Sequence, residues 1–252
     1  MNVAFIGKGG VGKSTIAGTF ARLLARTGRP VLTLDCDPMP GLSYALGVPV
    51  QDVTIPPDAV TERPFGSDGP RFVLVEDPIR AVQRYAPIGP DGVRFLSFGK
   101  QRGMLTAQMR SQTAFRQIID TLPTDQFDLV GDLPAGTRQP FFGWARFADT
   151  VVVVTDPSVK SIHTARRLAK LRDASWAPRR IVVVVNRLTD PSDCERVAEI
   201  TGLEVIGALT NDPLVALADR SGAAPLDAAA NGPFVRGVAE LVSTLCNLEV
   251  AA

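Results

Sequence analysis

The chain contains the stretch Gly7-Lys8-Gly9-Gly10-Val11-Gly12-Lys13-Ser14-Thr15, and this stretch decides the fold. From Gly7 to Ser14 it satisfies the phosphate-loop pattern G-x-x-x-x-G-K-[ST]. An apolar strand is predicted directly before it over 3–6, and a helical pattern follows it over 13–26. Backbone N–H groups of a glycine-rich turn at a helix N-terminus converge on phosphate oxygens, and the helix dipole favours negative charge there. The stretch therefore predicts a nucleotide site.

The side chains of this loop have distinct expected tasks. Lys13 is expected to reach the β- and γ-phosphates, and the hydroxyl of Ser14 is expected to ligate Mg²⁺. Lys8 is a second lysine, which the ordinary pattern does not require. The loop residues predicted to contact the nucleotide are Gly9, Gly10, Val11, Gly12, Lys13, Ser14 and Thr15.

The composition is that of an ordinary globular protein. The chain has 252 residues, of which 45% are hydrophobic and 21% charged, and its formal net charge is +1. A charge so near zero creates no overall field for nucleic acid or a membrane, so any such surface has to be local. The three cysteines have no pairing pattern, and neither a leader nor a membrane-length apolar run is visible. We expect a cytoplasmic protein.

Short apolar runs alternate with helical patterns along the whole chain. Several runs are almost entirely Val, Ile and Leu, as in parallel strands that are buried on both faces. The alternation predicts an α/β fold, a doubly wound and mostly parallel sheet of about eight strands with helices on both faces, in a single domain over 1–252. The predicted strands are 3–6, 31–34, 72–75, 93–98, 129–131, 151–155, 181–185 and 205–207. The predicted helices are 13–26, 79–85, 105–121, 158–173, 192–200, 213–220 and 233–247.

Two acidic segments follow predicted strands, at the edge where ligands of such sheets bind. In Asp35-Cys36-Asp37-Pro38, the carboxylate of Asp37 can orient an attacking water or contact the Mg²⁺ shell. The competing interpretation is a turn acid before a proline. Asp132 ends a later strand, in the position of an acid that holds Mg²⁺ through water, and the turn after it is placed to sense the γ-phosphate. The predicted magnesium set is Ser14, Asp37 and Asp132.

Two further segments are predicted to contact the base. Asn186 follows the strand 181–185, and its amide can both donate to and accept from a purine edge. The alternative is a strand-end asparagine in a turn. One strand later, the segment that contains Asp212 and Pro213 is expected to close over the base.

These motifs together resemble those of the deviant-Walker-A ATPases, a group that includes the MinD/ParA proteins, the nitrogenase iron protein and the CooC-like nickel-insertion ATPases. The K-G-G-x-G-K-[ST] loop of that group matches residues 8–14, its x-D-x-D-P segment matches Asp35-Cys36-Asp37-Pro38, and its D-x-P-A-G switch matches 132–136. Its adenine-contacting asparagine matches Asn186. The resemblance covers essentially the whole chain.

The resemblance implies a homodimer that forms on ATP binding, with ATP or ADP and Mg²⁺ as cofactors. In such proteins two monomers enclose two ATP molecules, so Lys8 is expected to reach the nucleotide of the partner subunit. The implied catalytic residues are Lys8, Lys13 and Asp37. Nucleotide state would then set dimer geometry, and the output would be directed at an unidentified protein partner.

The CooC-like branch is the most similar one. Its helix followed by a G-P-D-G turn is similar to residues 79–85 and Gly89-Pro90-Asp91-Gly92. The Cys-x-Cys metal pair of that branch is absent from 97–112, and the two cluster cysteines of the iron protein fall at Gly99 and Ala135. Met104 and Met109 are soft sulfurs, for which packing or an interface is expected. We therefore expect a CooC-like dimerising switch, acting for example in metalloenzyme maturation.

Other interpretations compete with this one. A ParA/MinD-like positioning ATPase would act on DNA or a cargo adaptor, and the basic run from Arg166 to Arg180 is the candidate DNA surface. That run lies on a helix with an apolar face, so a solvated face is favoured. A membrane anchor is not expected, because the tail after Phe234 has one base, Arg236. A module that hydrolyses ATP poorly is the third alternative. Cys36 is expected to be a small buried residue and His163 a surface or packing residue.

Overall fold

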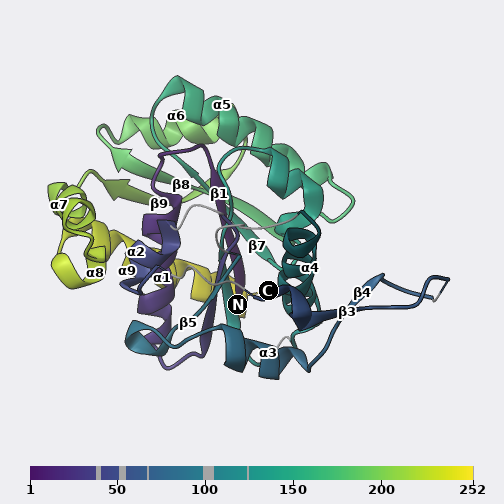
Figure 1. Cartoon of the computed structure of the whole chain (residues 1–252). Helices are drawn as coiled ribbons and strands as arrows, with labels where there is room; N and C mark the ends of the chain where they lie inside the picture. The colour runs from purple at the N-terminus through teal and green to yellow at the C-terminus, as the bar shows by residue number, and fades with distance from the viewer. Residues whose placement is uncertain (38–40, 51–54, 67, 99–104, 124, 252) are drawn as a thin grey trace.

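The computed structural model describes residues 1–37, 41–50, 55–66, 68–98, 105–123 and 125–251 (Figure 1). Within these ranges seven strands form the main sheet, in the order β5-β2-β6-β1-β7-β8-β9. Every neighbouring pair is parallel. The strands are β1 (Asn2–Gly7), β2 (Val31–Asp35), β5 (Arg94–Ser97), β6 (Asp128–Asp132), β7 (Thr150–Thr155), β8 (Arg180–Leu188) and β9 (Glu204–Thr210). The predicted doubly wound parallel sheet is confirmed.

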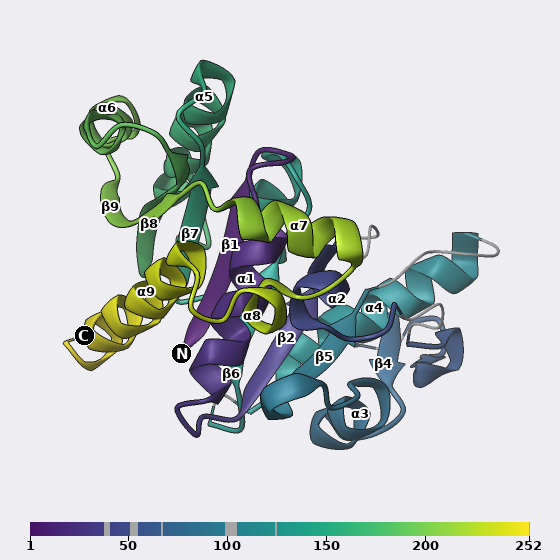
Figure 2. The same ribbon diagram turned by 90° about the vertical axis from the view of Figure 1, so that its left-hand side faces the viewer.

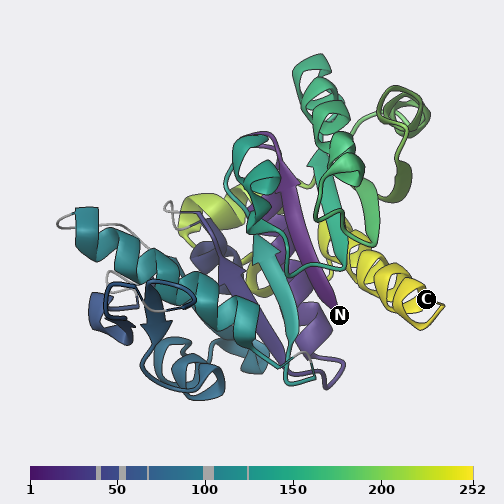
Figure 3. The same cartoon turned by 90° about the vertical axis from the view of Figure 1, so that its right-hand side faces the viewer.

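Helices cover both faces of the sheet, because alternate residues of each strand point to opposite sides. Val3 and Phe5 of β1 pack into one core with α1 (Lys13–Ala25) and α9 (Pro233–Val250), which Figure 2 shows in front of the sheet. Ala4 and Ile6 pack into a second core on the other face. The helices of that face, with α4 in front in Figure 3, are α3 (Pro78–Tyr85), α4 (Leu105–Thr121), α5 (Val159–Leu168) and α6 (Ser192–Thr201).

One predicted strand lies outside the main sheet. Residues 72–75 were expected in it, but β4 (Phe72–Leu74) pairs antiparallel with β3 (Val60–Glu62), which was not predicted. The main sheet therefore has seven described strands instead of about eight. The expected helix 158–173 is also shorter, because after Leu168 the chain tightens into a 3-10 turn, Ala169–Asp173. Period-2 and period-3.6 patterns identify elements but do not specify which strand pairs with which.

Three further helices lie on the side of the sheet that α1 covers. They are α2 (Gly41–Leu46), α7 (Pro213–Ser221) and α8 (Pro225–Ala228), of which only α7 was predicted. Figure 2 shows α7 and α8 beside α1 and α2. Of these, α2 and α7 contribute residues to the pocket beside the phosphate loop, while α8 packs against α7 and pairs with the later part of α1 through Asp227 and Arg22.

The C-terminal helix α9 is a core element. The five apolar residues that made this expectation are all buried: Val235, Val238, Leu241, Val242 and Leu245. Among the described helices, none is both long and apolar enough to cross a lipid bilayer. Burial of this stripe against the sheet confirms the prediction of packing.

Candidate functional site

The phosphate loop joins β1 to α1 and is built on two glycine positions with different constraints. A Cβ on Gly7 would lie 2.3 Å from the carbonyl oxygen of Val154, so the loop leaves the sheet where only glycine fits. Gly12 has φ 93° and its carbonyl accepts from the backbone N–H of Ile16 over 3.0 Å, which starts α1. Left-handed backbone at this point suits glycine. The loop therefore ends at a helix N-terminus, as the motif predicts.

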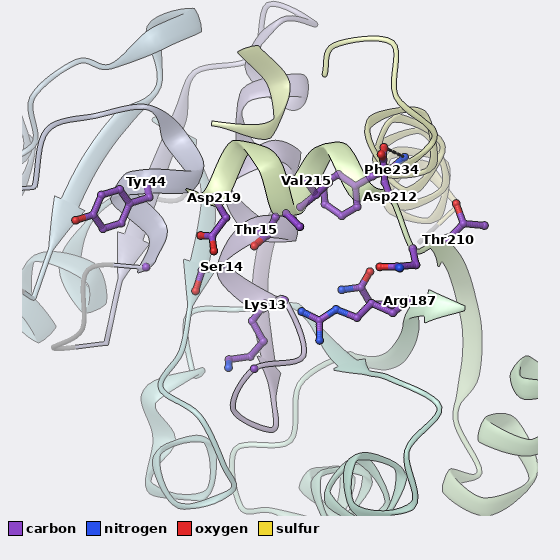
Figure 4. Close-up of a pocket in the computed structure, with 16 residues that line it drawn as sticks. Lys13, Ser14, Thr15, Tyr44, Arg187, Thr210, Asp212, Val215, Asp219 and Phe234 are labelled. Carbon is purple, nitrogen blue, oxygen red and sulfur yellow. Dashed lines mark hydrogen bonds between the residues drawn. The ribbon is translucent and has the colours of Figure 1, made fainter. Parts of the chain in front are cut away.

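A pocket of about 410 Å³ opens beside this loop (Figure 4). Its walls come from the start of α1, from α2, from the end of β8 and from α7 with the start of α9. Seven of the predicted site residues line it: Gly10, Gly12, Lys13, Ser14, Thr15, Asn186 and Asp212. Gly9, Val11 and Pro213 do not belong to its lining. The side chain of Val11 is fully buried in the core under α1, and Pro213 is the first residue of α7.

Lys13 is held at the bottom of the loop with only 7% of its surface exposed. Its Nζ donates to the carbonyl of Lys8 over 3.4 Å. Burial lowers the pKa of Lys13, and the nearby carboxylates of Asp132 and Asp37 act in the opposite direction. The nearby carboxylates offset only part of the cost of burying the Lys13 ammonium. An anion bound beside it would offset more, so the position suits a phosphate group.

Three carboxylates gather at the ends of β2 and β6, and two of them, Asp132 and Asp37, interact electrostatically with Lys13. Asp35 and Asp132 are fully buried strand-end residues that face each other in register, and the backbone N–H of Asp37 donates to Asp35 Oδ1 over 3.2 Å. Burial raises the pKa of Asp132 to about 6, while the Ser14 hydroxyl and Lys13 lower it. Burial, followed by the charge of Asp132, also raises the pKa of Asp35 well above its usual range. The cluster is rich in oxygen ligands and poor in solvent.

This cluster fits a magnesium ion. Asp132 Oδ1 is buried and has no hydrogen-bond partner, and Ser14, a neighbour that lowers the pKa of Asp132, also lines the nucleotide pocket. Within the described ranges no group of three or more His, Cys, Asp or Glu side chains is arranged to hold a metal by itself. Magnesium in nucleotide sites uses one or two carboxylates together with water and phosphate oxygens, so both observations agree with that ion.

The turn after Asp132 lies directly against the phosphate loop. The backbone N–H of Leu133 donates to the carbonyl of Phe5 over 3.1 Å, and that of Gly136 donates to Gly7 over 2.9 Å. Ala135 lies beneath Gly9, where a Cβ on the glycine would be 3.5 Å from the alanine methyl group. Residues 132–136 are therefore tied to β1 and the phosphate loop through backbone hydrogen bonds.

Asn186 lies against the loop with 5% of its surface exposed. Its Nδ2 donates to the carbonyl of Val11 over 2.7 Å, and a Cβ on Gly12 would come within 2.5 Å of the same nitrogen. The side chain thus supports the loop backbone while it lines the pocket. Sequence reasoning predicted its place at the strand end and did not anticipate the bond to the loop.

Asp212 serves as a shared cap for two helices. Oδ1 accepts from the N–H of Leu214 at the start of α7, and Oδ2 accepts from the N–H of Phe234 at the start of α9, over 3.0 and 3.3 Å. Both carboxylate oxygens are therefore engaged in the walls of the pocket. Asp212 therefore lines the pocket and also holds the starts of α7 and α9 next to each other.

Lys8 projects from the exposed side of the loop. Its side chain is half-buried, and its Nζ donates to the neighbouring carbonyl of Gly9 over a long 3.5 Å. None of the described carboxylates lies within ion-pair distance of it. The cation is thus held at the rim of the loop without a strong partner in the part of the chain that the structure describes.

Several lining residues were not predicted from the sequence. Tyr44, Arg187, Asp219 and Phe234 all line the pocket. Three of them come from helices α2, α7 and α9, which have no motif to mark a nucleotide site. Arg187 had one available signal, since it directly follows Asn186.

The sequence also led to expectations for residues outside the pocket, and most of them are confirmed. Cys36 is 2% exposed and belongs to the core, and His163 is exposed on α5. Met109 is half exposed, so core packing is wrong for it and the interface alternative stays a prediction. Met104 and Gly99 lie outside the described residues. On α5 and the turn after it, the buried side chains are Ile162, Ala165, Leu168, Ala169 and Leu171, and the exposed bases are Arg166, Arg167 and Lys170.

Comparison with known proteins agrees with this geometry. A family model described as the CobQ/CobB/MinD/ParA nucleotide binding domain matches residues 3–226. The carbon monoxide dehydrogenase accessory protein CooC of Rhodospirillum rubrum is 28% identical over 237 residues, covering 88% of each chain. An ATP-binding protein of Methanocaldococcus jannaschii is 31% identical over 227 residues, covering 84% of this chain and 86% of that protein.

The solved structures show the same fold at lower identity. The septum site-determining protein MinD from Pyrococcus horikoshii, complexed with Mg-ADP, superposes with a TM-score of 0.74 at 17% identity. The match covers 98% of this chain and 96% of that one. The chain therefore belongs to the CobQ/CobB/MinD/ParA nucleotide-binding domain family and is a P-loop ATPase of that family.

Proposed function

We propose that this protein is an ATP-dependent dimerising switch that hydrolyses ATP slowly and acts on a partner protein. The observation that carries the proposal is Lys8, a half-buried cation at the rim of the phosphate loop with no carboxylate partner among the described residues. A second copy placed against this rim would present its nucleotide phosphates to that cation. A cation supplied from the partner would stabilise the charge that develops during phosphoryl transfer.

The other residues take complementary roles in the proposal. Lys13 binds the terminal phosphates, and Gly9 to Thr15 surround them with backbone N–H groups. Ser14 and Asp132 hold the Mg²⁺ shell, in which the ion neutralises phosphate charge when it is bound. Asp37 extends from the turn beside them and orients the attacking water. Asn186, Asp212 and Pro213 form the base side of the site.

A metalloenzyme or its assembly apparatus is the partner class that we favour. CooC of Rhodospirillum rubrum, which is similar over most of its length, is named as an accessory protein of carbon monoxide dehydrogenase. Metal binding through cysteines is not part of the proposal. Cys36 is buried in the core, and Ala135 stands in the switch turn where the iron protein has a cluster cysteine. The switch would therefore act on its partner without holding a metal through cysteines of these positions.

A positioning ATPase is the second candidate. The exposed bases Arg166, Arg167 and Lys170 favour it, because phosphate contacts to DNA require no more than such a surface. The two candidates differ in their response to salt. ATP-dependent retention on DNA that falls steeply between 50 and 200 mM salt, by about a factor of 10³ for six contacts, would identify the positioning ATPase.

Light scattering after size exclusion tests the switch directly. The hydrolysis-blocked Asp37→Ala protein loaded with ATP and Mg²⁺ is expected to elute as a dimer, and the same protein with ADP as a monomer. The ATP-loaded form then serves as bait for partner capture, with the ADP form as the matched control. An ATP-loaded protein that stays monomeric across micromolar concentrations would contradict the proposal.

A further inference from the structure

Near its C-terminal end, β8 contains a residue in an unusual backbone conformation. Arg187 has φ 55°, in the left-handed region that a long side chain rarely occupies. The pairing of β8 with β9 shifts register at this point, since Asn186 pairs with Leu209 and Leu188 pairs with Thr210. Arg187 is therefore the extra residue of a β-bulge. Bulges of this kind redirect a side chain and occur often beside active sites.

The bulge changes the direction of Arg187. In a regular strand, the residue after Asn186 would point to the opposite face of the sheet, away from the phosphate loop. In the structure Arg187 lines the same pocket as Asn186, and its guanidinium extends across the pocket towards the side of Lys13 (Figure 4). Two consecutive side chains, Asn186 and Arg187, thus line one pocket.

The charges of the pocket lining make this guanidinium distinctive. Lys13 is buried at the bottom of the loop, and both oxygens of Asp212 are engaged at the starts of α7 and α9. Arg187 is exposed, and none of the described carboxylates lies within ion-pair distance of it. A free guanidinium in a pocket that opens onto a phosphate loop is suited to a phosphate oxygen.

We propose that Arg187 is a nucleotide-binding residue whose guanidinium contacts the phosphate chain of the bound nucleoside di- or triphosphate. The inference rests on the proposed nucleotide function of the same pocket. It also explains why the chain keeps an arginine where glycine would be free of strain, because strained backbone of this kind persists where the ligand contact depends on it.

Titration calorimetry with ADP and Mg²⁺ at 50 mM NaCl tests the inference. Arg187→Gln is expected to weaken binding about tenfold, because a charge-assisted hydrogen bond is lost. The loss should shrink when the titration is repeated at 500 mM NaCl. Arg220→Gln is the matched control, since Arg220 is an exposed arginine on α7 that does not line the pocket, and its affinity should stay within twofold of wild type.

Arg187→Gly separates binding from stability. It removes the guanidinium and the strain together, so it should weaken ADP binding as Arg187→Gln does while the nucleotide-free protein unfolds at an equal or higher temperature. If wild type binds ADP and Arg187→Gln binds it equally well, the inference is wrong. An affinity loss that is the same at both salt concentrations would also overturn it. If wild type itself binds neither ADP nor ATP, the proposed function fails first.

Discussion

Asp35 and Asp132 lie opposite each other in register at the carboxyl ends of β2 and β6, and each keeps one buried carboxylate oxygen without a hydrogen-bond partner. Two carboxylates in this arrangement oppose ionisation, both through burial and through each other's charge. The pair is thus unfavourable in the nucleotide-free protein. A hydrated cation that binds with the nucleotide would supply partners for the two unpaired carboxylate oxygens and offset their repulsion.

The pH dependence of stability should report this arrangement. The pKa of Asp132 is raised to about 6 by burial, so between about pH 4 and pH 6 the native state binds more protons than the unfolded state does. The free energy of unfolding therefore falls as pH rises through this window. Asp132→Asn removes the cost of ionising a buried carboxylate. The free energy of unfolding of this variant, relative to that of wild type, should therefore increase by roughly 2–3 kcal/mol from pH 4 to pH 7.5. Urea titrations at both pH values measure it, and a difference that is independent of pH would contradict it.

The contact between Asn186 and the loop predicts unequal effects of two glycine substitutions. Gly12→Ala and Gly10→Ala each place alanine in left-handed backbone, at a cost of about 1–2 kcal/mol. Only at Gly12 would the new Cβ also collide with Asn186 Nδ2, which is bonded to Val11, whereas no atom lies within 4 Å of a Cβ on Gly10. Gly12→Ala should therefore be the more destabilising change in thermal unfolding. Equal losses would show that Asn186 moves aside freely.

Lys8 should affect association without affecting the fold. Because its one bond, to Gly9, is long and exposed, Lys8→Ala should leave the unfolding temperature of the monomer unchanged. ATP-dependent dimerisation should weaken at least tenfold, since a cation that faces the partner's phosphates is lost. Sedimentation velocity with Lys160→Ala, an exposed lysine at the start of α5, provides the control. Unchanged dimerisation and turnover would refute the role of Lys8 across the interface.

The double cap at Asp212 predicts a graded loss of stability. Asp212→Ala removes the acceptors at the starts of both α7 and α9, and at about 1 kcal/mol for each cap the expected loss is about 2 kcal/mol. Asp212→Asn keeps one oxygen acceptor and should lose about half as much. Chemical denaturation of the three proteins measures this order. If both variants lose the same amount, the two caps do not contribute separately.

Much of the fold could be predicted from the chain because its signals are local. The runs of Val, Ile and Leu in β7 and β8 indicate buried parallel strands, and the pattern from Gly7 to Ser14 includes its own strand and helix. The partner of Phe72–Leu74 could not be predicted in this way, since a short apolar run fits a main sheet and a separate hairpin equally well.

The sequence by itself determined the parallel sheet, the phosphate loop and the family, because consecutive residues carry these signals. Only the tertiary structure decided that Asp132 has an unpartnered oxygen beside Asp35, that Asp212 caps two helices, and that a bulge turns Arg187 into the pocket. These features depend on which strand ends and helix starts meet in space. Burial and register between distant segments create them, and no local pattern in the chain encodes such contacts.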